Sequence, residues 1–322
     1  MTEQTHIHHE DHHHDHPAGW RHRLTHLFQP HSHDHRQLAA DRAFAANQAG
    51  IRTVWLALAA LTITSVLQLV IVLTSGSVAL LGDTAHNIGD GLNSLPLLLA
   101  FYLARRLPTK RYTYGFGRAE DIAGIFIVLS ILVSAGIVLW ESVQRLIAPQ
   151  PLENLGWVAA AAIIGFLGNE AVAILQIRTG RRIGSEALVA DGLHARTDGL
   201  TSLAVLVAAG GTWLGYPIVD PLVGLFIGVV ILIISWDATK RMWLRLMDAV
   251  DPEMINRAEH VVQSHPAVHK VKRVRLRWVG HQLQGDLRVV IDSGADRPET
   301  VHEIRHALEH EFPELTDMAV EF

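Results

Sequence analysis

Residues 83–95 read D-T-A-H-N-I-G-D-G-L-N-S-L, and residues 191–203 read D-G-L-H-A-R-T-D-G-L-T-S-L. Seven of the 13 positions are identical, and the two copies lie 108 residues apart. Each copy sits in a long apolar stretch, where a carboxylate or an imidazole is costly to bury and is therefore a candidate functional group. Residues four apart share one face of a helix, so each copy presents a histidine and an aspartate together. The repeat predicts a membrane-embedded polar site built from two helices.

Apolar runs long enough to cross a bilayer recur along the first three quarters of the chain. Each has roughly the 17–25 residues that a bilayer core requires. Backbone groups in lipid are satisfied only in helices or closed barrels, and unbroken apolar runs without alternation favour helices. We expect six transmembrane helices, at Ile51–Thr74, Val78–Leu103, Ile122–Leu146, Leu155–Ile177, Ala187–Leu214 and Ile218–Trp236.

Lysine and arginine gather in alternate connections between these runs. The first and fifth connections contain none, and the third has only Arg145 near its edge. Because positively charged loops stay on the cytoplasmic side, both termini are predicted to be cytoplasmic. The second and fourth connections and the segment after the last run carry Arg105, Arg106, Lys110, Arg111 and Arg118, then Arg178, Arg181 and Arg182, then Lys240, Arg241 and Arg245.

After Asp248 the chain becomes polar enough to fold in water. Two segments that look helical, 252–264 and 298–312, each begin with a proline near the first turn. Two alternating segments, 270–278 and 283–291, indicate strands, and 318–322 is a third. The order α-β-β-α-β predicts a small α+β, ferredoxin-like domain.

Three regions are therefore expected. They are a disordered, His-rich cytoplasmic tail (1–45), a six-helix transmembrane domain (46–248) and a cytoplasmic C-terminal domain (249–322). Twelve of the 21 histidines lie within residues 1–35, and loose capture of metal ions is the role favoured for them.

Composition removes several classes of function. The 322 residues include no cysteine, so disulfides, thiolate metal sites and thiol catalysis are excluded. The formal net charge of −5 gives no reason to expect a nucleic-acid partner. With 49% hydrophobic residues, the lipid bilayer is the expected surrounding of the helices.

The repeated motif offers His86, Asp90, His194 and Asp198 to one ion. Two imidazoles and two carboxylates suit a tetrahedral divalent cation, which favours zinc, with cobalt fitting nearly as well. Two ionised aspartates balance the charge of the ion, and the empty site favours protonation of the same groups. Metal and proton therefore compete, as an exchanger requires. A repeat that merely packs two helices through small residues such as Gly91, Ser94, Gly199 and Ser202 is the plainer alternative.

Asp83 and Asp191 each precede a motif histidine by three residues. Their position allows two roles, either orienting the imidazoles from behind or capping the start of a helix. The sequence favours neither.

With these residues in view, the chain resembles the cation diffusion facilitators, and among them the zinc-transporting members. The resemblance covers about residues 45–322 and rests on G-S-V-A-L-L-G-D-T-A-H-N-I-G-D (76–90) and L-V-A-D-G-L-H-A-R-T-D (188–198). R-Y-T-Y-G-F-G-R-A-E (111–120) and Y-P-I-V-D-P-L-V-G (216–224) support it. It implies a homodimer without a prosthetic group that exports zinc, with cobalt or cadmium as further substrates, in exchange for protons. It also implies that the four motif residues are the transport ligands.

The resemblance also identifies departures. Relatives with aspartate at the position of His86 are associated with broader or different metals, so His86 favours zinc. Some relatives have further ligands in the connection after the second helix, where this chain has Tyr112, Thr113 and Phe116 and we expect no metal site. Histidines of the cytoplasmic zinc sites are replaced here by Arg288 and Glu321.

Residues 302–306 spell H-E-x-x-H, the helix motif of zinc proteases, and His302 matches a cytoplasmic ligand position of the relatives. A protease needs a third ligand and a substrate cleft, so a solvated helix face is favoured, with a weak metal site at His302 and His306 as the alternative. Two rival functions remain for the whole chain, an intramembrane metallohydrolase and a membrane-tethered metal sensor. We expect a transporter in a bacterial inner membrane and not an enzyme.

Overall fold

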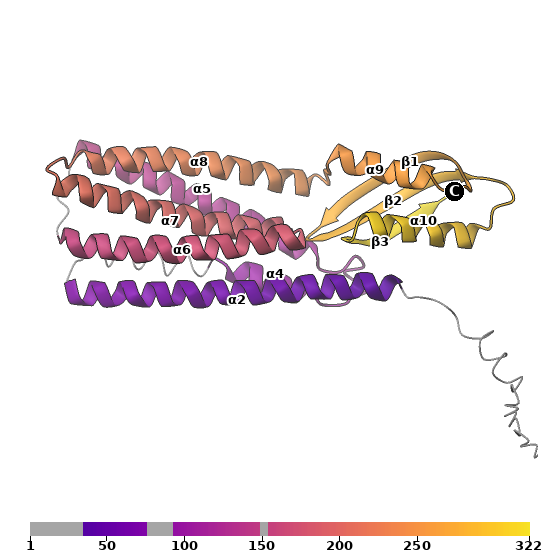
Figure 1. Cartoon of the computed structure of the whole chain (residues 1–322), viewed down its shortest axis with the longest axis horizontal. Coiled ribbons are helices and arrows are strands. Elements are labelled where there is room, and N and C mark those ends of the chain that lie inside the picture. Colours follow the sequence, from indigo (N-terminus) through magenta and orange to yellow (C-terminus); the bar gives the residue numbers. More distant parts are fainter. Residues whose placement is uncertain (1–34, 76–92, 149–153) are drawn as a thin grey trace, which may run out of the picture. The chain divides into compact units, whose positions relative to one another are not determined.

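The structure is a computed structural model that describes residues 35–75, 93–148 and 154–322, with side chains in the first range described from residue 42 to residue 74. Residues 36–322 cluster as one unit. Six helices precede the C-terminal domain in the described part of the chain (Figure 1). They are α2 (His35–Ser75), α4 (Leu95–Ala104), α5 (Arg118–Ile147), α6 (Leu155–Ile183), α7 (Glu186–Trp213) and α8 (Val219–Leu246).

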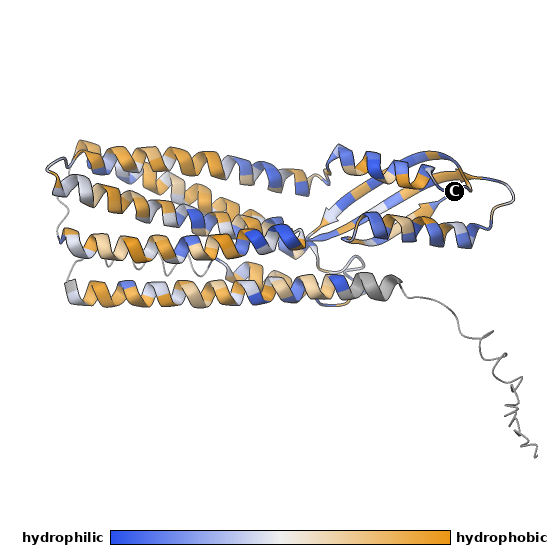
Figure 2. Cartoon of the chain, viewed as in Figure 1, coloured by the Kyte–Doolittle hydropathy of each residue, from blue (hydrophilic) through white to orange (hydrophobic). Residues whose placement is uncertain are grey.

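The prediction of a helical transmembrane domain is confirmed. Among the described residues, four helices are long and apolar enough to cross a membrane: Arg42–Thr74 within α2, then α5, α6 and α8. Figure 2 shows that apolar colouring predominates along these helices, and that α6 and α8 become hydrophilic at their ends next to the C-terminal domain. The fifth predicted span is α7, which has 28 residues but interrupts its apolar surface with the second copy of the motif. Of the second predicted span, α4 is described, and residues 78–92 lie outside the described residues.

The first helix begins sixteen residues before the predicted start of the first span, at His35. Residues 35–45 were assigned to the disordered tail on their polarity, yet they are helical. Alanines at 39, 40, 43, 45 and 46 explain the difference, because alanine has the highest intrinsic helix propensity and the following apolar helix supplies the nucleus.

Small residues set the distances between the helices. A Cβ added at Gly224 of α8 would overlap Ser142 of α5, and one added at Gly168 of α6 would overlap Thr64 of α2. A Cβ at Gly165 would lie 2.8 Å from Ser202 Oγ of α7. Small residues at helix interfaces allow the backbones to approach closely in lipid. The expected packing role of Ser202 is therefore observed, at the far end of the second motif copy.

The C-terminal domain has the predicted element order. Its helices are α9 (Pro252–Gln263) and α10 (Arg297–Glu311), and its strands are β1 (Val268–Val279), β2 (Gln282–Ile291) and β3 (Leu315–Glu321). In the sheet, β2 pairs antiparallel with β1 and parallel with β3. Asp251 and Asp296 cap the two helices. Leu283, Leu287, Ile304, Leu308 and Phe312 are among the residues of the buried core.

Candidate functional site

The second copy of the motif, residues 191–203, lies in the middle of α7. His194 is 2% exposed and Asp198 is 7% exposed, and His194 Nδ1 lies 3.9 Å from Asp198 Oδ1. The two side chains share one helix face, as their spacing predicts. Arg196 between them pairs with Glu170 of α6 at 2.7 Å, so its charge has a partner of its own on a different helix. His86, Asp90 and Asp83 lie outside the described residues.

The end of the first motif copy lies against the second copy. The side-chain nitrogen of Asn93 is 2.9 Å from His194 Nε2 and also donates to Ser130 Oγ of α5 at 3.0 Å. This contact involves Nε2, so the other ring nitrogen, Nδ1, faces Asp198. Asn93 therefore orients the His194 ring, a contact that the sequence repeat did not identify.

Asp191 is held beside this pair. Ser94 Oγ donates to both of its carboxylate oxygens, at 3.0 and 2.7 Å, and Gln176 Nε2 donates to Oδ2. The start of α7 is capped by Ser185, whose side chain accepts from the Leu188 N–H. Capping is therefore not the role of Asp191, which lies one and a half turns further along the helix. Its carboxylate instead links α4, α6 and α7 close to His194.

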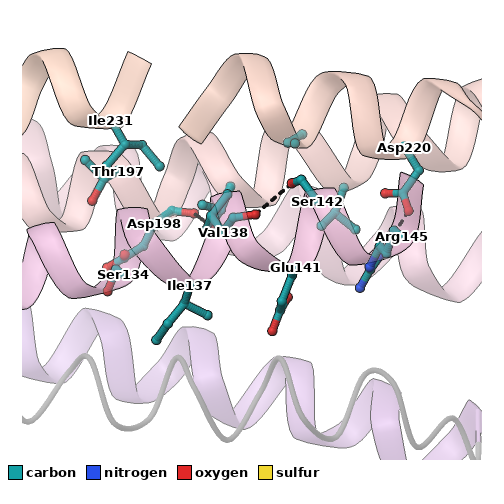
Figure 3. Close-up of a pocket in the computed structure, with 14 residues that line it drawn as sticks. Ser134, Ile137, Val138, Glu141, Ser142, Arg145, Thr197, Asp198, Asp220 and Ile231 are labelled. Atoms are coloured by element: carbon teal, nitrogen blue, oxygen red, sulfur yellow. Dashed lines mark hydrogen bonds and ion pairs between the residues drawn. The ribbon is translucent and has the colours of Figure 1, made fainter. Parts of the chain in front are cut away.

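A cavity of about 440 Å³ reaches Asp198 from the end of α5 and α8 that is remote from the C-terminal domain. Hydroxyl groups line its inner part, with Thr197 and Thr201 donating to the carbonyl oxygens of their own helix. Arg145 and Asp220 line its other end and form an ion pair of 3.0 Å (Figure 3). The cavity is large enough to hold several water molecules.

A second buried polar cluster joins the C-terminal domain to the helices. His281, in the turn between β1 and β2, places Nδ1 2.8 Å from Glu120 Oε2 of α5, and its Nε2 lies 3.4 Å from the amide of Asn47 of α2. Arg245 of α8 donates to the carbonyl oxygen of Gly280 at 2.6 Å. Gly280 has φ +59°, and an added Cβ would lie 2.8 Å from Glu120 Oε2, so the turn needs glycine.

Burial alone would lower the pKa of His281, but the hydrogen bond to Glu120 and the charge of that carboxylate more than offset it, so the pKa is raised. The protonated form is therefore favoured in the folded protein. Sequence reasoning missed this cluster because its members are far apart in the chain. The glycine between two predicted strands was the available signal, and it indicates a turn but not what the turn contacts.

On the C-terminal domain, Arg288 and Glu321 face each other across β2 and β3, with Arg288 Nη2 2.6 Å from Glu321 Oε2. This hydrogen bond lowers the pKa of the Glu321 carboxyl. His302 and His306 are exposed on α10, where Glu303 is bonded to His265. Within the described ranges, no group of three or more His, Cys, Asp and Glu side chains is arranged to hold a metal ion.

Comparison with known proteins fits this architecture. Residues 54–247 match the model of the cation efflux transmembrane domain, and residues 250–321 match that of the cation efflux protein cytoplasmic domain. The chain belongs to the cation efflux family. A probable cation efflux system protein of Mycobacterium tuberculosis is 48% identical, over 95% of this chain and 92% of the relative.

More distant relatives widen the comparison. The zinc transporter ZitB of Escherichia coli is 28% identical over 73% of this chain and 75% of its own length. The magnetosome protein MamB of Paramagnetospirillum magneticum is 27% identical over 82% of this chain and 91% of its own length. Members of the cation efflux family are transporters, so this chain is an integral membrane cation transporter and not an enzyme. The metallohydrolase reading is thereby set aside.

Proposed function

We propose that this cation efflux protein exports zinc from the cytosol in exchange for protons, through one tetrahedral site made of His86, Asp90, His194 and Asp198. The observation that carries the proposal is the contact between Asn93 and His194. Asn93 belongs to the first motif copy and follows Asp90 by three positions in the sequence. The first motif copy therefore ends next to the described half of the site.

The chemistry of the donors supports zinc. His194 offers a nitrogen and Asp198 an oxygen from one face of α7, and both are nearly inaccessible to solvent. Zinc accepts nitrogen and oxygen ligands in a tetrahedral arrangement, whereas magnesium and calcium prefer more oxygens. Cobalt and cadmium are the nearest competitors for such a site. The family relative ZitB, whose name describes a zinc transporter, supports the same substrate.

Proton coupling follows from burial. When no cation is present, two carboxylates close together in an apolar region favour taking up protons. Zinc binding requires those protons to leave, and protons arriving from the opposite side favour zinc release. Asp191, tied to Ser94 and Gln176 beside His194, would hold the surrounding helices in register as a second layer around the ligands, and Asp83 would do the same for His86.

The remaining features are assigned by the same reasoning. The functional unit is a homodimer in a bacterial inner membrane, with both termini in the cytoplasm, as the basic connections favour. The His-rich segment 1–35 would capture zinc near the entrance. His302 and His306 on α10 would form at most a weak metal site.

The proposal is tested by transport assays in proteoliposomes that hold the full chain, with zinc, cobalt, cadmium and manganese offered in turn under an imposed pH gradient. Zinc flux should exceed the others and should rise with the gradient. Flux that ignores the gradient would remove proton exchange from the proposal. Manganese transport as fast as zinc transport would remove the selectivity assigned to the two histidines.

A further inference from the structure

Among the described residues that line the cavity reaching Asp198, three ionisable side chains play no part in the proposed zinc site. They are Glu141 and Arg145 of α5 and Asp220 of α8. Arg145 stands in the last turn of α5 and Asp220 in the first turn of α8, so both are at the end of the helices remote from the C-terminal domain. A cation that leaves Asp198 through this cavity therefore has to pass them.

Arg145 and Asp220 are bonded to each other. The distance from Arg145 Nη1 to Asp220 Oδ2 is 3.0 Å, and the Asp220 side chain is 15% exposed whereas that of Arg145 is 41% exposed. Figure 3 shows the Arg145–Asp220 pair at one end of the cavity and Asp198 of α7 away from that end. Tight packing of Gly224 on Ser142 holds α5 and α8 together next to the pair.

A mostly buried carboxylate beside an exit route can slow a transporter of divalent cations, because it can bind the departing ion. Zinc binds carboxylate oxygen, so an unpaired Asp220 near Glu141 would retain the departing ion. Arginine stays protonated under all physiological conditions and offers a fixed fork of donors to a carboxylate. Its bond to Asp220 Oδ2 engages one of the two oxygens that zinc would otherwise bind, and its charge repels an ion that returns.

We propose that Arg145 is a release-controlling residue, which keeps Asp220 from trapping the exported cation at the outer end of the cavity. The inference rests on the proposed export through Asp198. It assigns Arg145 a role in the rate of release and none in the affinity of the transport site, because the pair lies at the other end of the cavity from Asp198.

The test measures zinc flux in proteoliposomes as a function of zinc concentration, with the full chain carrying Arg145→Gln. The maximal rate should fall by about fivefold, the upper limit for one partly exposed ion pair, while the zinc concentration for half-maximal flux stays equal or decreases. The double variant Arg145→Gln with Asp220→Asn removes the trap and should recover most of the rate. Arg241→Gln is the matched control, since it breaks a pair of similar exposure with Glu186 on α7 and should transport normally.

Two results overturn the inference. One is a wild-type rate for Arg145→Gln, and the other is a double variant as slow as the single one, which would mean that the pair only holds the helices together. Asp198→Ala, measured in parallel, distinguishes a failure of the release role of Arg145 from a failure of the proposed transport site. If Asp198→Ala abolishes flux while Arg145→Gln has no effect, the release role fails alone, and if Asp198→Ala transports normally, the proposed site fails as well.

Discussion

Substituting His281 by leucine tests how firmly the C-terminal domain is anchored to the helices. The change removes the partner of Glu120 Oε2, and both side chains of the pair are at most 3% exposed. Breaking a buried ion pair from one side leaves the other charge uncompensated and costs about 3–5 kcal/mol. His265→Leu is the matched control. It breaks a contact of the same 2.8 Å length in which the His265 side chain is 12% and the Glu303 side chain 54% exposed. Because solvent reaches Glu303, this pair is worth about 0–1 kcal/mol.

The assay is thermal unfolding of the purified protein in detergent, followed by tryptophan fluorescence. His281→Leu should unfold at a clearly lower temperature than the wild type. His265→Leu should unfold at nearly the same temperature as the wild type. The double variant Glu120→Gln with His281→Leu should regain part of the lost unfolding temperature, because it also removes the unpaired charge of Glu120. Equal effects of the two single substitutions would refute the reasoning from burial.

The pH dependence has a defined sign. Because the pKa of His281 is raised above its usual value of about 6.5, its contribution to stability is fully present below that value and is lost as the pH rises through the folded-state pKa. The wild type should therefore lose stability toward alkaline pH relative to His281→Leu. A difference between the two proteins that stays constant from pH 6 to pH 9 would contradict this assignment.

Two further predictions concern packing and selectivity. Gly224→Ala should destabilise the helix bundle by about 1–3 kcal/mol, because its Cβ overlaps Ser142, while Gly136→Ala in α5, where the Cβ meets no described atom within 4 Å, should be neutral in the same unfolding assay. His86→Asp should widen transport toward cadmium or manganese in a vesicle metal panel, because an oxygen replaces a nitrogen in the proposed ligand set; unchanged selectivity would show that His86 is not the filter.

Local signals predicted the elements well. Prolines at the first helical turns located α9 and α10 to within a residue or two, and alternation located β1 and β2. These features depend on neighbours along the chain. The start of α2 was placed too late because the prediction weighed polarity over the helix propensity of the alanines. The four-residue spacing likewise predicted the shared face of His194 and Asp198.

Contacts between segments that are distant in the chain could not be predicted from these local signals. The bond from Ser94 to Asp191 joins residues 97 positions apart, and the Glu120–His281 pair spans 161. Ser94 and Asp191 both belong to the repeat, but the repeat does not indicate that they bond to each other. Glu120 and His281 belong to no motif, because a buried histidine looks the same in sequence as an exposed one. The repeat indicated the candidate ligands, but only the packed helices show which side chains form hydrogen bonds with His194 and Asp191.

The central claim is that one intramembrane site couples zinc to protons, and Asp198→Ala tests it most directly. The measurement is zinc-driven proton flux in proteoliposomes, recorded together with the oligomeric state of the purified variant. The account predicts that Asp198→Ala forms an intact dimer and shows no zinc-driven proton flux. A dimeric Asp198→Ala protein that retains the wild-type flux would contradict it.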